Sequence, residues 1–394
     1  IPTIISFKKF LKIFYMENMF TDTVKIKLFS QIQANLVALE PNCENEQIDQ
    51  IIDLIPTTYF EEKENLMIVC KIFASYSRSK PRMYRQNALK LFEKLIIPIK
   101  THLQNHPVFF WNLFGSLNYF KQWLYEEGLI TIDVIIESAI HDENYRIIEY
   151  FLPEIIEKRP ELFENEFKNK ITTPYSEEYI SEFKQLRKKY FNWLRESNDV
   201  NDAIYGEIEK NQLRLAIKRD DIDKFQTMIS NLNMPIESKI KESLIEHSFI
   251  KDIEQTLLEF AIDWNAIKIS KYLIMNGAKF TGICSFNSIY MGNYEFIHMA
   301  ESINREDFNE SLLYAAIECW NMELSEYAIE NCNFGFIEEE NVESDKDEKI
   351  SKIFSKICNY ANFEFFEKIF LPFLQKNQRY VNEKKYSLLI QSFY

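Results

Sequence analysis

Glycine and proline are scarce in this chain, which has 7 Gly and 11 Pro among 394 residues. Globular proteins of average composition carry roughly 7% Gly. Sheet-rich folds need many turn residues of these two types, so their scarcity favours helices joined by short connections. Seven scattered glycines could hardly build a phosphate-binding loop, and neither that motif nor a G-x-S-x-G nucleophile turn occurs.

Cysteine pairs and long apolar runs are also missing. The six cysteines, at positions 43, 70, 284, 319, 332 and 358, form no C-x-x-C pair and no dense framework. Several stand in apolar stripes, a pattern typical of reduced core thiols in an intracellular protein. No stretch approaches the apolar length that spans a bilayer. Residues 1–15 contain three lysines and no small-residue cleavage site, so we expect no signal peptide. Met16 would be a sensible start, and whether residues 1–15 belong to the native protein stays open.

Basic residues are outnumbered, 46 to 60, which gives a net charge of −14. This charge opposes the phosphate backbone, so we expect no nucleic-acid partner. The only notable basic cluster, residues 187–189, is short and is interpreted as the solvated face of a helix. The run from Glu338 to Lys349 holds seven acids against two lysines and predicts a solvated or disordered loop.

The most informative feature that is present is an internal repeat. Residues 256–276 align with residues 311–331 without a gap. In each copy an alanine, Ala261 or Ala316, is followed four positions later by a residue at which a helix is expected to end. Self-similarity of this kind indicates a repeat architecture, in which each unit buries its apolar face only against its neighbours.

The same frame recurs along the chain, and three of the six intervals between anchors are 27 or 28 residues long. Each unit predicts two short helices. In the best unit, residues 257–262 form one apolar stripe and residues 269–273 form a second stripe after a break at Asn265. The anchors are Trp111, Ala139, Ala216, Ala261, Ser288, Ala316 and Ile357, and the helix-ending slots are Gly115, Glu143, Asp220, Asn265, Gly292, Trp320 and Ala361.

The best unit resembles the ankyrin repeat, with its threonine, leucine, alanine, paired aliphatic and Gly-Ala positions. The residues that carry this resemblance are Thr256, Leu258, Ala261, Ile269, Leu273, Ile274, Gly277 and Ala278. It covers roughly residues 110–371 and is specific in 256–278 and 311–333. Leu257 or Leu312 replaces the family's proline, and the units are shorter than the usual 33 residues. The chain is similar to the divergent ankyrin-type proteins of parasitic protists. The resemblance implies an all-α fold, an α-solenoid of stacked helical hairpins with stunted β-turn fingers.

The first hundred residues lack the frame but show helical stripes, such as the one containing Leu66, Cys70 and Phe73. A charged helix is expected from Glu177 to Arg195. The predicted regions are a helical N-terminal region continuous with the solenoid (1–100), the first ankyrin-like units (101–159), a helical insertion (160–205), the regular units (206–336), the acidic loop (337–350), and the last unit with a C-terminal cap (351–394).

Candidate catalytic residues are few. His102 and His106 have the i, i+4 spacing at which two helical histidines can share a metal. No glutamate stands beside His102 to act as a base, no third ligand is indicated, and Pro107 follows at once. Acid pairs such as Asp220-Asp221 are typical of helix caps. The sequence therefore predicts no catalytic site, no metal and no cofactor.

What remains is a binding surface. In ankyrin arrays, the two residues after the anchor pair face the concave groove. The resemblance assigns this role to Asp263, Trp264, Tyr290, Met291, Glu318 and Cys319. Aromatic and Met side chains are favoured at interface centres, but they also fill gaps between helices, and both interpretations stay open.

The leading hypothesis is a non-enzymatic, cytoplasmic scaffold or adaptor. It would bind a protein partner of unknown identity on its concave face, without membrane insertion. One alternative is an enzyme or enzyme subunit with its chemistry in the N-terminal region. The other is a structural assembly component.

Overall fold

The computed structural model describes residues 23–376, except residues 81–83, 115–116, 172–175, 198, 242, 247–253, 304 and 332–342. Helices make up 74% of the structure, and its described part contains one sheet of two short strands, which confirms the predicted all-α class. No helix in this part is long and apolar enough to cross a membrane. The chain forms two compact units: unit 1 contains residues 1–94 and 288–394, and unit 2 contains residues 95–287.

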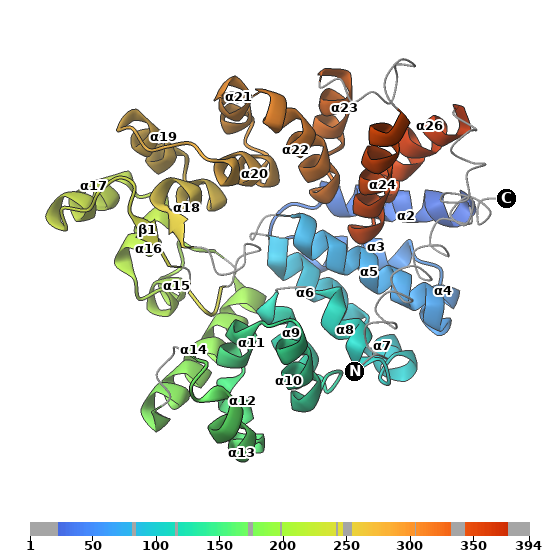
Figure 1. Ribbon diagram of the computed structural model, residues 1–394. Coiled ribbons are helices and arrows are strands. Elements are labelled where there is room, and N and C mark those ends of the chain that lie inside the picture. The colour runs from blue at the N-terminus through green and yellow to red at the C-terminus, as the bar shows by residue number, and fades with distance from the viewer. Residues whose placement is uncertain are drawn as a thin grey trace. The chain divides into compact units, whose positions relative to one another are not determined.

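Unit 2 is a series of short helices with one small antiparallel sheet (Figure 1). Its elements are α7 (Ile96–His102), α8 (Pro107–Leu113), α9 (Asn118–Glu126), α10 (Ile132–His141), α11 (Tyr145–Tyr150), α12 (Leu152–Lys158), α13 (Pro160–Leu162), a π-helical turn (Phe163–Phe167), α14 (Glu177–Glu196), α15 (Ala203–Ile208), α16 (Gln212–Lys218), α17 (Ile222–Asn231), β1 (Lys239–Ile240), β2 (Gln255–Thr256), α18 (Leu257–Asp263) and α19 (Ile267–Met275). The next helix, α20 (Gly282–Met291), runs from unit 2 into unit 1.

Neighbouring hairpins of unit 2 stack helix on helix. The pairs α10 with α11, α16 with α17, and α18 with α19 each form a hairpin. Between hairpins, α16 packs on α18 and α17 packs on α19. The two strands pair through Lys239 opposite Thr256 and Ile240 opposite Gln255, just before α18 begins.

Each hairpin of the repeat frame turns through a residue with a left-handed backbone. The φ angles at the described slots are 52° at Glu143, 52° at Asp220, 53° at Asn265, 66° at Gly292, 55° at Trp320 and 48° at Ala361. Gly115 lies outside the described residues. In all six turns, the N–H of the residue after the slot donates to the anchor's carbonyl at 2.8–3.0 Å. This is the Schellman arrangement, which satisfies two carbonyls at the end of a helix. The predicted helix ends are confirmed at these six slots.

The residue after the slot also starts the second helix. Its side chain accepts a backbone N–H of the first turn in four hairpins, where it is Asp221, Asn293, Asn321 or Asn362. Ala266, the equivalent residue before α19, has no such acceptor. There Asp220, from the preceding hairpin, accepts the N–H groups of Lys268 and Ile269 at 3.1 and 3.0 Å. One carboxylate therefore caps a helix of the next hairpin and joins the two hairpins.

Unit 1 combines the N-terminal helices with the last hairpins. Its elements are α2 (Thr23–Ala38), α3 (Asn45–Asp53), α4 (Thr58–Glu61), α5 (Lys63–Ser79), α6 (Arg85–Lys94), α21 (Tyr294–Ile303), α22 (Arg305–Glu318), α23 (Met322–Asn331), α24 (Glu343–Asn359), α25 (Phe363–Phe365), a π-helical turn (Phe366–Phe370) and α26 (Leu371–Lys376). α22 packs on α24 and α23 packs on α25, which repeats the stacking seen in unit 2.

Helix α2 packs on α25 and on the π-helical turn after it, so the two ends of the described chain meet in one core (Figure 1). The rings of Phe29 and Phe363 are 5.0 Å apart, and both side chains are fully buried. Gln33 donates to the Asn362 side chain at 2.9 Å and accepts the N–H of Glu364 at 3.1 Å. The sequence analysis placed residues 1–100 ahead of the repeats along the chain. The structure packs α2 and α5, from this region, against the last repeats.

A π-helical turn accounts for a length difference between two similar segments. Residues 144–153 read NYRIIEYFLP and residues 362–372 read NFEFFEKIFLP, which is one residue longer. The longer segment contains the π-helical turn Phe366–Phe370, whereas the first is α-helical from Tyr145 to Tyr150. A π turn absorbs one extra residue without ending a helix.

The buried core agrees with most predicted stripes. All seven anchors are buried, as are Leu66, Cys70 and Phe73. The charged helix predicted from Glu177 to Arg195 is α14, which ends one residue later. The acidic run differs in part from the prediction. Residues 338–342 lie outside the described residues, but residues 343–349 are the first turns of α24 and not a loop. Acids in a first turn interact favourably with the helix dipole.

The left-handed turn predicts opposite effects of one substitution at two sites. Glu143 and Glu137 are both exposed, and Glu143 has a φ of 52° whereas Glu137 lies inside α10. Glu143→Gly should raise the free energy of unfolding by about 1 kcal/mol, because glycine adopts the left-handed conformation without strain. Glu137→Gly should lower it by about 0.5 kcal/mol. Urea unfolding measures both, and equal shifts of the same sign would show that the turn is misplaced.

Candidate functional site

The six residues predicted to line a groove are largely covered by the chain's own residues. Asp263, Tyr290 and Cys319 are buried, and Trp264, Met291 and Glu318 are half-buried. Asp263 and Trp264 belong to unit 2, and the other four belong to unit 1. In each unit, these positions contact residues from other parts of the chain.

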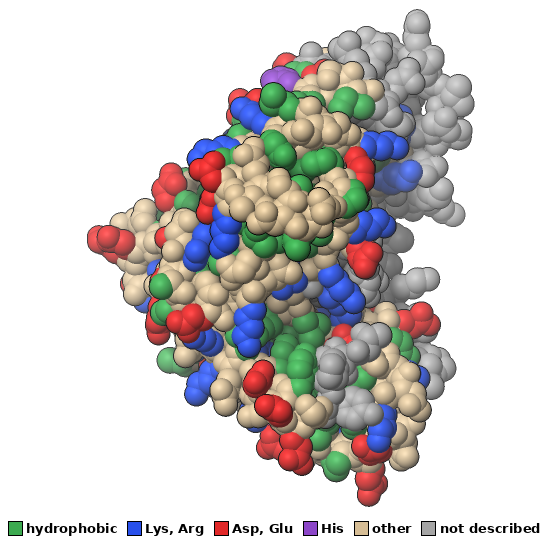
Figure 2. All heavy atoms as spheres, turned by 90° about the vertical axis from the view of Figure 1, so that its left-hand side faces the viewer, with side chains coloured by type: hydrophobic (Ala, Val, Ile, Leu, Met, Phe, Trp, Pro, Cys, Tyr) green, Lys and Arg blue, Asp and Glu red, His purple; other side chains and the backbone are tan. Residues whose placement is uncertain are grey.

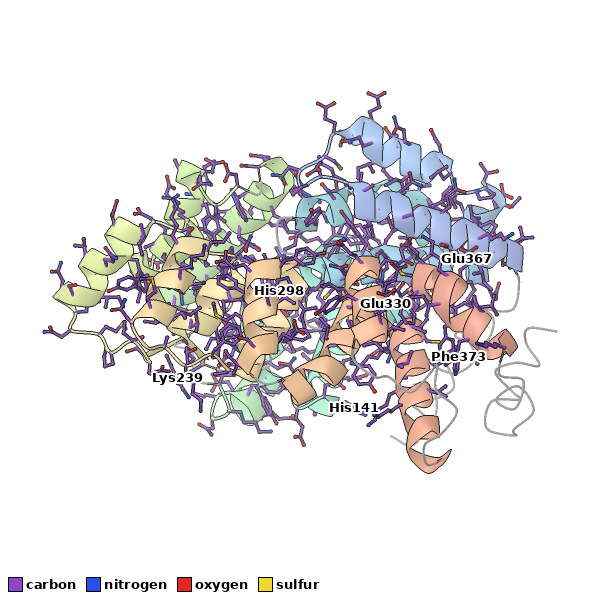
Figure 3. All side chains as sticks on the ribbon, turned by 90° about the horizontal axis from the view of Figure 1, so that it is seen from above. His141, Lys239, His298, Glu330, Glu367 and Phe373 are labelled. Carbon is purple, nitrogen blue, oxygen red and sulfur yellow. The ribbon has the colours of Figure 1, made fainter. Side chains whose placement is uncertain are left out.

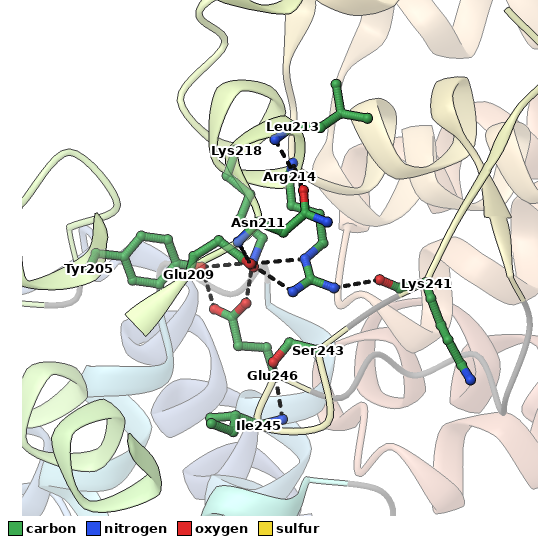
Figure 4. A network of polar contacts seen from close by, with 10 residues as sticks. All are labelled: Tyr205, Glu209, Asn211, Leu213, Arg214, Lys218, Lys241, Ser243, Ile245 and Glu246. Carbon is green, nitrogen blue, oxygen red and sulfur yellow. Dashed lines mark hydrogen bonds and ion pairs between the residues drawn. The ribbon is translucent and has the colours of Figure 1, made fainter. Parts of the chain in front are cut away.

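Unit 2 contains a buried ion-pair network centred on Lys218 (Figure 4). Trp264 lies over the ammonium group of Lys218. The Lys218 ammonium is 4.5 Å from the centre of the Trp264 ring. It donates to a carboxylate oxygen of Glu209 at 2.6 Å, to the hydroxyl of Tyr205 at 2.9 Å, and to Glu246. The Lys218 side chain is 0% exposed. An ammonium has three N–H donors, and these three acceptors use all of them.

Arg214 completes the network from the same helix. Its guanidinium binds the Glu209 carboxylate at 2.7 and 3.0 Å and donates to the carbonyl of Lys241 at 2.7 Å. Two cations therefore face two carboxylates, Glu209 and Glu246. Burial and the neighbouring Glu246 raise the pKa of Tyr205 well above its usual value, so its hydroxyl stays protonated and donates to Glu246. Buried charges that are paired and hydrogen-bonded in this way are stable without a ligand.

Residues 200–209 make this network internal. Lys218 and Arg219 follow the anchor pair of α16, the place where a groove residue was expected. Arg219 donates to the carbonyls of Val200 and Asp202 at 2.7 and 2.9 Å. Residues 200–209, which include the last residues of the predicted insertion, thus cover this side of the hairpin.

In unit 1, the equivalent positions lie against the last turn of α5. The Tyr290 hydroxyl donates to the carbonyl of Lys80 at 2.5 Å. Arg78 donates to the carbonyl of Asn359 at 3.1 Å, and its guanidinium is 5.3 Å from the centre of the Tyr360 ring. One turn earlier on α5, Tyr76 lies beside Trp320. The N-terminal helix α5 therefore occupies the side of the last hairpins where the groove was predicted.

Glu318 and Cys319 lie beside this contact. Glu318 forms an ion pair with Lys356, one turn before the end of α24. Burial raises the pKa of the Cys319 thiol, which keeps it protonated at neutral pH. The thiolate is the nucleophilic form, so Cys319 is a packing residue in this environment.

The histidine pair considered in the sequence does not share a helix. His102 is the last residue of α7, and His106 precedes the first residue of α8. Figure 3 shows two further histidines, His141 at the end of α10 and His298 on α21. His141 lies 3.0 Å from the carboxylate of its neighbour Asp142. Among the described residues, no group of three or more His, Cys, Asp and Glu side chains could hold a metal ion.

The sequence reasoning overlooked two exposed apolar residues in unit 2. Met275, the last residue of α19, is 86% exposed, and Leu232, the residue after α17, is 61% exposed. They stand ten and twelve positions after the slots Asn265 and Asp220, at the ends of the second helices of adjacent hairpins. An apolar residue outside the helical stripe, at the end of a second helix, was the signal that could have identified them.

Comparisons of the chain with protein-family models, curated proteins and solved structures found no match. The resemblance to the ankyrin repeat stays a prediction from the sequence.

The Lys218 network predicts a large loss of stability when its centre is removed. Lys218→Met should lower the free energy of unfolding by roughly 3 kcal/mol, because Glu209 and Glu246 would remain as buried charges without their ammonium partner. Lys184→Met is the matched control, since Lys184 and its partner Glu157 are exposed at 56% and 64%. We expect the control to change stability by about 0.5 kcal/mol or less. Chemical unfolding compares the two, and similar losses would contradict a buried network.

Proposed function

We propose that this chain is a non-enzymatic protein-binding scaffold or adaptor, built as an ankyrin-like solenoid. The stacked hairpins support this proposal, because repeat arrays present extended surfaces on which packing does not dictate the exposed side chains. The observation that carries it is the pair of exposed apolar residues, Leu232 and Met275, on consecutive hairpins of unit 2.

Leu232 and Met275 belong to adjacent second helices. α17 packs on α19, and the N–H of Lys279, after α19, donates to the Glu237 carboxylate, after α17, at 2.7 Å. This hydrogen bond joins the segment after α17 to the segment after α19, close in sequence to Leu232 and Met275. Exposing a large apolar side chain forgoes roughly 1.5–3 kcal/mol of burial. A partner protein that covers both residues recovers part of that free energy, and methionine is frequent at such interfaces.

This proposal moves the binding surface away from the six residues predicted first. A partner at Asp263 and Trp264 would have to disturb the Lys218 network, and one at Tyr290 and Cys319 would have to displace α5. The ends of α17 and α19 require no such rearrangement.

The proposal names no nucleic acid and no lipid bilayer as partner. The face shown in Figure 2 carries hydrophobic side chains in small groups, with acidic and basic side chains interspersed. The net charge of −14 opposes phosphate binding. The five described cysteines are all buried free thiols, which supports a cytoplasmic location.

Quantitative affinity capture from cells tests the proposed function. The double variant Leu232→Ser with Met275→Ser should lose its specific partners relative to the unchanged chain. Truncation of a central interface residue commonly costs roughly 2 kcal/mol or more, which corresponds to about a thirtyfold loss of affinity. Because both side chains are exposed, the thermal unfolding of the variant should stay close to that of the unchanged chain.

Ile97→Ser is the matched control, because Ile97 is 75% exposed in the same unit but lies on α7. Figure 1 draws α7 at the other end of unit 2 from α17 and α19. The control should keep every partner. A folded double variant that recovers the same partners as the unchanged chain would refute this surface.

A further inference from the structure

The stretch of sequence that contains Met275 has a net charge opposite in sign to that of the whole chain. Residues 264–294 contain no Asp or Glu, although the chain has 60 acidic residues in 394 and about five would be expected in a stretch of this length. The same stretch contains three lysines, Lys268, Lys271 and Lys279, and all three are exposed. Exposed lysines without acids in the same stretch are unusual for a chain with a net charge of −14, and such a group of charges can favour partners of opposite charge.

These lysines lie on both sides of Met275 in the sequence. Lys271 precedes Met275 by four positions and Lys268 precedes it by seven, so the three side chains share one face of α19. Lys279 follows Met275 by four positions, in the segment that is tied to Glu237. We call Leu232, Lys268, Lys271, Met275 and Lys279 the Met275 surface.

Two acids, Asp220 and Glu237, contact this segment through its backbone. The Asp220 carboxylate accepts the N–H groups of Lys268 and Ile269, and the Glu237 carboxylate accepts the N–H of Lys279. Both acids therefore fix the backbone of the Met275 surface.

We propose that the Met275 surface binds an acidic peptide segment of a partner protein, one that also carries apolar side chains. This inference rests on the proposed function and specifies the chemistry of its partner. Apolar side chains of the segment pack on Leu232 and Met275, while its carboxylates face the three lysines. Charge complementarity of this kind speeds association and fixes orientation, and it weakens as salt is added.

The observations favour a peptide over an anionic membrane or a nucleic acid. Membrane recognition through charge uses clusters of about 4–8 Lys or Arg residues. The Met275 surface has three lysines, and the net charge of −14 repels a continuous anionic surface. A short acidic segment avoids most of that repulsion because screening limits it to about 8 Å at physiological salt.

Fluorescence anisotropy with a synthetic peptide tests the proposal on the full chain. The probe has the sequence IEEENVESDKDEKI, which is that of residues 337–350 and combines seven acids with apolar residues at both ends and in the middle. A matched peptide with every Asp and Glu replaced by Asn and Gln is the charge control. The acidic probe should bind, with an affinity that falls as salt is raised, and the neutral peptide should bind at least tenfold more weakly.

Two triple variants localise the binding. Lys268→Glu, Lys271→Glu and Lys279→Glu together should weaken probe binding at least tenfold and remove its dependence on salt. The control triple Lys184→Glu, Lys188→Glu and Lys210→Glu changes three exposed lysines elsewhere in unit 2 and should leave binding within twofold. Equal binding by the two triple variants would overturn the proposal.

Other occupants give different results. Binding to phosphatidylserine vesicles without binding to the probe would overturn the proposal in favour of a membrane. Self-association that the first triple variant abolishes would overturn it in favour of a second copy of this chain.

Affinity capture separates this inference from the proposed function. If the first triple variant keeps the partners that Leu232→Ser with Met275→Ser loses, the acidic chemistry is wrong and the binding surface stands. If the double variant keeps all partners, the proposed surface itself fails.

Discussion

The left-handed residue at the end of each first helix is the constraint on which the rest of the structure depends. It reverses the chain, brings the next N–H onto the anchor's carbonyl, and lets the following residue start the second helix. Only glycine adopts this conformation without cost, and a non-glycine residue there costs about 1–2 kcal/mol. Five of the six described slots hold other residues, including Trp320 and Ala361. Packing of the stacked hairpins must therefore offset that strain at each of these turns.

The anchors and helix ends could be predicted because they follow from local sequence. A small or apolar anchor, a slot four positions later and an Asn or Asp after the slot all act within six residues of one another. The charged helix α14 was predictable for the same reason, since it begins after Ser176, whose side chain caps it, and shows a 3.6-residue stripe. The slot is occupied by Glu, Asp, Trp or Ala in different hairpins, so the type of residue alone does not identify it. The slots were identified because the same frame recurs along the chain.

The covering of the predicted groove could not be predicted, because it depends on contacts between distant residues. Tyr290 meets Lys80 across 210 positions, and Gln33 meets Asn362 across 329. Lys218 contacts Glu246, which lies 28 positions later in the sequence, after β1. No periodicity in the sequence encodes such pairs. The positions predicted to line a groove are thus used here for internal packing, whereas Leu232 and Met275, at the ends of α17 and α19, are exposed.

The central claim is that the last hairpins depend on the chain's own N-terminal helices, and deletion of residues 1–94 tests it most directly. Hydrogen exchange, read by mass spectrometry, should show that the described helices of residues 288–376 lose their protection while those of residues 95–287 keep theirs. The physical reason is that α2 and α5 bury Phe363, Trp320 and Asn362, which would otherwise be exposed. Native-like protection of residues 288–376 in the shortened chain would contradict the account and would show that these hairpins fold as an independent linear array.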